Sequence, residues 1–188
     1  MRRSLITAGC GVLLAALVER GHLDAEPRRV NLRQELDAAQ IVTHARIVAY
    51  APDGLKAKPL PGPSPIVSAR YSTDPTWRPG RLISGGWPGE SESLTAYWPP
   101  VGSEVLLVAN PQNIVSLFAK RQGDAWRFWS PEMTGSVALF ECEPPAIPVE
   151  PAGKVPPVED AGPGTVVSWD GCLVPVGAVM TKGVTISS

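Results

Sequence analysis

Three carboxylates stand close to tryptophans in a stretch rich in Pro, Gly and Ser, and this arrangement is the one that most suggests catalysis. Asp74, Glu90 and Glu92 lie there, with Trp77 and Trp87 nearby. Paired carboxylates supply the acid and the base or nucleophile of glycoside hydrolysis, and an aromatic face beside them suits a sugar ring. A small hydrolase is therefore one alternative function. The competing interpretation is that these loop carboxylates are simply solvated.

The second chemical feature is a set of aromatic residues beside prolines. Trp77 is followed by Arg-Pro-Gly, Trp87 by Pro-Gly and Trp98 by Pro-Pro, and Tyr97 precedes Trp98. Proline restrains the backbone, so these rings can be presented to a sugar, a peptide or a protein at a small entropic cost. Segment 76–100 is thus the predicted recognition site, with Trp77, Trp87, Trp98 and Tyr97 as its binding residues. The alternative is that the rings complete the hydrophobic core.

Histidine and the known cofactor motifs offer little further chemistry. His44 lies in a predicted strand, where a structural role is expected, and His22 lies beside the N-terminal apolar run. The chain has no cysteine or histidine pair with zinc spacing, and no phosphate-binding loop, dinucleotide fingerprint or nucleophile elbow. We therefore expect no metal, no cofactor and no catalytic residue.

The charge distribution bears on the partners. The formal net charge is -1, from 17 Lys and Arg against 18 Asp and Glu, and the arginines are scattered. Nucleic-acid binding requires a clustered basic face, so we expect no nucleic-acid partner. A protein or a glycan remains as the expected ligand class, and the sequence does not define the oligomeric state.

The N-terminus resembles an export signal. Arg2 and Arg3 precede an apolar run from Leu5 to Val18, which is shorter than the roughly 20 residues of a membrane span but suits a signal peptide. Residues 1–25 are thus the predicted leader, and the mature chain is expected to be periplasmic, at the cell surface or secreted, without an integral membrane span. The alternatives are an ordinary N-terminal helix, or lipid attachment at Cys10, which would give a lipid-tethered protein of a bacterial envelope.

Removal of the leader leaves two cysteines, Cys142 and Cys172. An even pair in an exported protein indicates a disulfide. This bridge would hold both ends of a proline-rich segment and fix the C-terminal segment to the rest of the domain. The alternative is a pair of free buried thiols.

The elements that must position these residues are short, because the chain contains 21 Pro and 18 Gly, a composition that favours many turns. A helix is expected at Asn31–Ala39, with Asn31 as its cap and Leu32 and Leu36 on one face. β-Branched or alternating runs predict the strands. These are Ile41–Tyr50, Ile66–Ser72, Leu94–Trp98, Glu104–Ala109, Ile114–Lys120, Ala125–Trp129, Ser136–Cys142, Thr165–Trp169 and Cys172–Val176. Lys56–Pro65, with four prolines, is expected to be an extended loop.

The predicted domain covers residues 26–142, followed by a proline-rich excursion at 143–164 and a C-terminal strand segment at 165–188 that packs back on the domain. Glu104–Ala109 is nearly continuously apolar, as expected of a strand buried on both faces. The fold class is therefore mostly β: a small antiparallel barrel, OB-like, or a sandwich of six to eight short strands, with one short N-terminal helix.

The order of these elements carries a resemblance. VTHARIVAY as a first strand, an alternating second strand, and PPVGSEVLLVAN leading into hairpins resemble small secreted OB-fold barrels of the netrin-like and tissue-inhibitor-of-metalloproteinase-like kind. The resemblance covers about Ile41 to Lys120 and implies a closed barrel with protected edges. This chain lacks the N-terminal cysteine framework of those inhibitors, so the resemblance implies no site residue. The sequence predicts an exported, non-catalytic binding or structural module.

Overall fold

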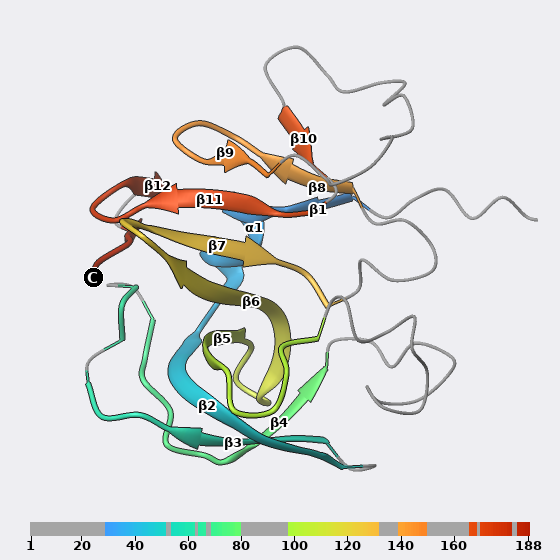
Figure 1. Ribbon diagram of the computed structural model, residues 1–188. Coiled ribbons are helices and arrows are strands. Elements are labelled where there is room, and N and C mark those ends of the chain that lie inside the picture. The colour runs from blue at the N-terminus through green and yellow to red at the C-terminus, as the bar shows by residue number, and fades with distance from the viewer. Residues whose placement is uncertain are drawn as a thin grey trace, which may run out of the picture.

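The computed structural model describes residues 29–51, 54–62, 64–66, 69–79, 98–131, 139–149, 166–168, 170–181 and 184–188 (Figure 1). In these residues the protein is mostly β, with 13 short strands and one helix, which confirms the predicted fold class. The elements are β1 (Arg29–Asn31), α1 (Leu32–Ala38), β2 (Ile41–Ala51), β3 (Gly54–Pro59), β4 (Thr76–Pro79), β5 (Glu104–Ala109), β6 (Ile114–Gln122), β7 (Ala125–Trp129), β8 (Leu139–Cys142), β9 (Ile147–Pro148), β10 (Val166–Ser168), β11 (Cys172–Pro175), β12 (Val179–Thr181) and β13 (Val184–Thr185).

The main sheet has eight strands in the order β4-β3-β2-β5-β6-β7-β11-β9. It curls so strongly that β4, at one edge, also pairs in parallel with the start of β6. Figure 1 shows this curl in the lower half of the molecule. The sheet does not close into the barrel that the resemblance implied. The contact between β4 and β6 is limited to two residue pairs, Arg78 with Ile114 and Pro79 with Val115, and β6 continues the open sheet through β7.

A second layer lies over one face of the main sheet. It consists of the three-stranded sheet β1-β8-β10, in which β1 and β8 are parallel, together with α1 and the β12–β13 hairpin. The outer core lies between the two layers and the inner core lies inside the curl. The outer core includes Val42, Leu106, Val108, Leu117, Phe128 and Phe140, and the inner core includes Ile47, Leu55, Trp77, Leu107, Val115 and Phe118.

Strand β5 separates these two cores. Leu106 and Val108 face the outer core, whereas Val105, Leu107 and Ala109 face the inner core. All five side chains are buried. This confirms the predicted strand buried on both faces, and it explains why the strand is almost uniformly apolar.

Helix α1 is held at its start as its sequence predicts. The backbone of Asn31 is in the β region, and its side-chain Oδ1 accepts a hydrogen bond from the Gln34 N–H, at 3.0 Å. Leu32 and Leu36 are fully buried in the outer core. The Asn31 amide also donates to Glu141 and to Glu143 just beyond β8, so the cap ties the helix to the second sheet.

The strand predictions for β2, β5, β6 and β7 are confirmed, whereas two neighbouring predictions are wrong. Lys56–Pro65 was expected to be a loop, but β3 extends to Pro59 and pairs with β2 and β4. Ile66–Ser72 was expected to be a strand, but in the described residues Ile66 and Arg70 form only isolated bridges, to Ile186 and Ile41. Because these two bridges go to different neighbours, no ladder forms.

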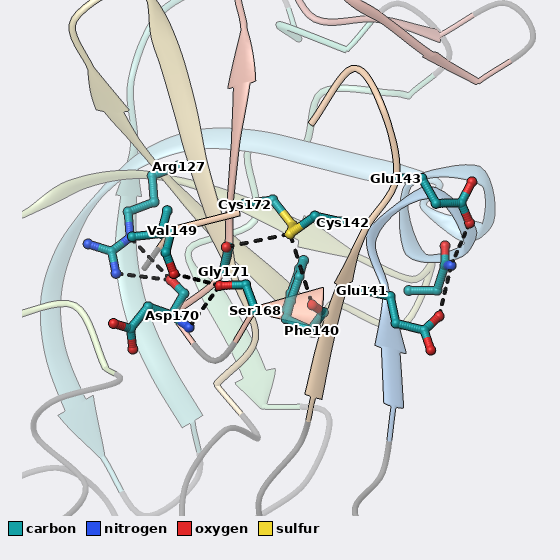
Figure 2. Close-up of a disulfide and its surroundings, with 11 residues drawn as sticks. Arg127, Phe140, Glu141, Cys142, Glu143, Val149, Ser168, Asp170, Gly171 and Cys172 are labelled. Carbon is teal, nitrogen blue, oxygen red and sulfur yellow. Dashed lines mark hydrogen bonds between the residues drawn. A yellow bond between two sulfur atoms is a disulfide. The ribbon is translucent and has the colours of Figure 1, made fainter. Parts of the chain in front are cut away.

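The predicted disulfide between Cys142 and Cys172 is present. Cys142 ends β8 in the second sheet and Cys172 begins β11 in the main sheet, and both are fully buried. Figure 2 shows the bridge beside Gly171, whose carbonyl oxygen lies 3.6 Å from the Cys142 sulfur. The bond therefore joins the two layers covalently.

Candidate functional site

Four side chains stand in one row across the main sheet. Arg46 in β2 lies opposite Glu104 in β5, and Arg121 in β6 lies opposite Trp126 in β7. Strands β5 and β6 pair antiparallel up to Leu106 opposite Ala119; Glu104 and Arg121 come two residues beyond this last pair, and both line the same groove. Alternation along each strand puts the row on the face that carries the outer core.

The outer face is hollowed at this row. A groove of about 300 Å³ is lined by His44, Glu104, Arg121, Trp126 and Ser188. His44 comes from β2, where it lies opposite Leu106 on the same face. The groove thus combines residues from four adjacent strands and the last residue of the chain.

Trp126 belongs to the outer core and lines the groove with the small part of its surface that is exposed. Its side chain is only 5% exposed, and its Nε1 donates to the Ser187 carbonyl at 3.1 Å. The His44 ring meets the indole edge-on, with centroids 6.2 Å apart, and the guanidinium carbon of Arg121 lies 5.7 Å from the indole centroid. A cation at this distance is attracted by the indole face, so the ring also helps to orient Arg121.

Glu104 is held in its charged form. Its carboxylate accepts a hydrogen bond from Arg46. This hydrogen bond, with smaller contributions from the charges of Arg46 and His44, lowers the pKa of Glu104 below its usual value. The other oxygen, Oε2, lies 4.0 Å from His44 Nε2, too far for a hydrogen bond.

Arg121 is anchored through one side of its guanidinium. Its Nε donates to the Gly123 carbonyl at 2.6 Å, and its Nη2 lies 3.8 Å from the exposed Asp124 carboxylate. Arg121 Nη1 and the His44 ring nitrogens donate to no residue in the described part of the chain. The groove therefore offers three polar groups with unused hydrogen-bonding capacity: Nη1 of Arg121, the imidazole of His44 and Oε2 of Glu104.

The rim is completed by the C-terminal residues. Ser187 donates to the Pro65 carbonyl through both its N–H and its hydroxyl, which fixes Ser188 at the groove. Within the described residues, the Ser188 hydroxyl makes no hydrogen bond to His44. The pair is therefore not arranged as a nucleophile and its base.

Two of the aromatic residues predicted to bind a ligand are buried. Trp77 is 0% exposed and Trp98 is 6% exposed, and both belong to the inner core. Trp98 packs edge-on against Phe118 and Tyr50. For these two rings the structure agrees with the core alternative and not with surface recognition, because the curled sheet encloses the space that they fill.

Of the three carboxylates predicted for hydrolysis, the structure describes only Asp74. Asp74 uses both oxygens for structure: Oδ1 accepts from the Thr76 N–H at 2.8 Å and Oδ2 from the Asn113 side chain at 2.5 Å. It thereby shapes the entry to β4 and links it to the turn before β6. The predicted binding residues Trp87 and Tyr97, the carboxylates Glu90 and Glu92, and the leader with Cys10 lie outside the described residues.

Two searches of the described residues bear on the site's chemistry. No group of three or more His, Cys, Asp or Glu side chains in that part of the chain is arranged to hold a metal ion. No helix among the same residues is long and apolar enough to cross a membrane.

Sequence reasoning missed the groove, apart from considering His44. Arg46, Glu104 and Arg121 each look like an ordinary solvated charge in its own strand. The signal that could have revealed them is their position in the alternation of each strand. Each is a charged residue on the face of β2, β5 or β6 that otherwise contributes mostly apolar residues to the outer core. Only a correct pairing of all three strands shows that they meet.

Comparison with known proteins gave no match to a protein-family model, to a curated protein or to a solved structure. The netrin-like resemblance therefore stays a prediction, and the function is argued from the groove itself.

Proposed function

We propose that this protein is an exported, non-catalytic binding module whose ligand occupies the groove at His44 and Arg121. The observation that carries the proposal is the set of unused polar groups on Glu104, Arg121 and His44 in a groove that Trp126 also lines. A few convergent polar groups on a largely apolar wall are what small-ligand sites have in common.

Export is supported by the disulfide. Bonds of this kind persist in oxidising compartments and are rare in the cytosol, and the bridge between Cys142 and Cys172 is compatible with such a location. Mass determination of the mature N-terminus tests this part of the proposal. A mature chain that starts near residue 26 supports secretion, whereas one that starts at a lipid-modified Cys10 supports the tethered alternative.

Ligand binding is tested with the folded protein on glycan and peptide arrays, together with three variants. Arg121→Ala and His44→Ala should abolish binding of any array hit, because both residues line the groove. Lys120→Ala is the matched control: Lys120 is exposed and is adjacent to Arg121, so it points to the other face of β6. A hit that survives both groove variants would contradict the proposed site.

Turnover provides the contrasting result. If a chromogenic glycoside panel detects hydrolysis that is lost in Glu90→Gln, the protein is a hydrolase and the non-catalytic proposal is wrong. Trp87 and Tyr97 remain predicted binding residues, and Trp87→Ala can be measured on the same arrays.

A further inference from the structure

The groove holds a negative and a positive group side by side that do not pair with each other. Glu104 and Arg121 lie just beyond the last residue pair of β5 and β6 and line the same groove, and oppositely charged neighbours across strands ordinarily attract. Here Glu104 pairs with Arg46 on its other side. Arg121 turns toward Trp126 and the Gly123 carbonyl.

Each of the two groups has one end without a hydrogen bond among the described residues. Arg46 takes up Oε1 of Glu104, while Oε2 makes no hydrogen bond within the described residues. Arg121 uses Nε and orients Nη2 toward Asp124, which leaves Nη1. Both residues line one groove of about 300 Å³, so one small ligand can contact both.

We propose that this groove binds a zwitterion, a free α-amino acid with an apolar side chain. The inference rests on the proposed function, because it takes the groove as the binding site. The ligand carboxylate accepts hydrogen bonds from Arg121, the ammonium group donates to Oε2 of Glu104, and the side chain lies against Trp126 and His44. A groove of about 300 Å³ is of the size of such a ligand rather than of an extended polymer.

The charges argue against the simpler ligands. A ligand with only a carboxylate would pair with Arg121 but leave Oε2 of Glu104 without a partner, and a ligand with only a cation would pair with Glu104 but leave Nη1 of Arg121 without one. A neutral ligand would cover two charges without compensating either of them, which costs solvation free energy. A zwitterion compensates both, and charge complementarity of this kind also gives specificity.

Calorimetric titration with four compounds tests the inference on the unmodified protein. L-Leucine and L-phenylalanine should bind. N-Acetyl-leucine, which lacks the ammonium group, and leucinamide, which lacks the carboxylate, should each bind at least about tenfold more weakly, since each loses one charged hydrogen bond.

Variants then assign the two ends of the ligand. Arg121→Gln and Glu104→Gln should each weaken leucine binding at least about tenfold, whereas Lys120→Gln should leave it unchanged. Melting temperatures show whether each variant is folded, and the four-compound series stays decisive if one variant is not.

The outcomes separate the two claims. If N-acetyl-leucine and leucinamide bind as tightly as leucine, or if Arg121→Gln does not change leucine binding, the zwitterion inference is wrong. If none of the amino acids binds but an array glycan or peptide binds in the groove, this inference fails and the proposed function stands. If nothing binds in either experiment, both fail.

Discussion

At the residue scale, the two tryptophans Trp77 and Trp126 are both buried but differ in how their N–H groups are satisfied. The Trp126 Nε1 donates to the Ser187 carbonyl. The Trp77 Nε1 is buried and has no hydrogen-bond partner among the described residues. A buried donor without a partner costs free energy, so the stabilising contribution of Trp77 comes from its packing in the inner core. Trp126 is instead held in a fixed orientation by its hydrogen bond to the Ser187 carbonyl.

Tyr50 gives a prediction about alkaline pH. Its hydroxyl donates to the Pro99 carbonyl, and burial raises the pKa of Tyr50 above its usual value. Folding therefore favours the neutral phenol. The stability that Tyr50 contributes is fully present below the unfolded pKa of about 10, and it is lost as the pH rises above that value towards the higher pKa of the folded protein.

We therefore expect the free energy of unfolding to fall more steeply above about pH 10 in the wild type than in Tyr50→Phe, by up to about 1.4 kcal/mol per pH unit. Urea unfolding from pH 8 to pH 11 measures this difference. The two curves should approach each other as the pH rises, and parallel curves would contradict the prediction.

At the element scale, the turn between β10 and β11 places the disulfide. Gly171 has a φ of +98°, and a Cβ at this position would lie 2.0 Å from the Phe128 carbonyl oxygen. The same turn is bound by Arg127, whose guanidinium donates twice to the Asp170 carbonyl, and by Ser168, which donates to the Val149 carbonyl (Figure 2). Only glycine allows β11 to approach β7 this closely.

Gly171→Ala should destabilise the protein by more than about 2 kcal/mol, because the new methyl group meets a backbone atom and the residue stays left-handed. Gly123→Ala is the matched control: it also has a positive φ, of +58°, but nothing lies within 4 Å of its Cβ position. Gly123→Ala should cost only the free energy of holding an alanine in the left-handed conformation, about 1–2 kcal/mol. Equal unfolding free energies for the two variants would refute the steric explanation.

The sequence was informative where one segment determines its own structure. Asn31 capped its helix, the apolar run of β5 indicated burial on both faces, and two cysteines indicated their bond. It failed where a distant segment decides. Pro59 could end β3 because β4 pairs only with Leu55 and Lys56 of β3, so that β3 is a sheet edge at Pro59 and tolerates the missing N–H. The groove depends on the register of four strands, which no single segment contains.

At the scale of the whole molecule, the disulfide is a covalent cross-link between the two layers, in addition to the backbone. It closes a loop with a sequence separation of 30 residues, which restricts the unfolded chain and is worth about 3–4 kcal/mol on the loop-entropy model. Cys142 and Cys172 are both fully buried, so a reductant reaches the bond only after the layers separate.

The double variant Cys142→Ser, Cys172→Ser should therefore lose about 3–4 kcal/mol of unfolding free energy. Added dithiothreitol should change the wild type slowly, at its rate of unfolding, and should leave the double variant unaffected. Rapid reduction of the wild type under native conditions would contradict this, and the thiol release measured with a chromogenic reagent gives the rate.

Ser188 has a practical consequence for anyone who produces this protein. It lies on the rim of the groove, and Ser187 before it is held by Pro65 and by the Trp126 indole. Any residues fused after Ser188 would leave the fold at the mouth of the groove. A purification tag placed directly after Ser188 would then compete with the ligand, so that a tagged preparation could be well folded and still give a false negative in every binding screen.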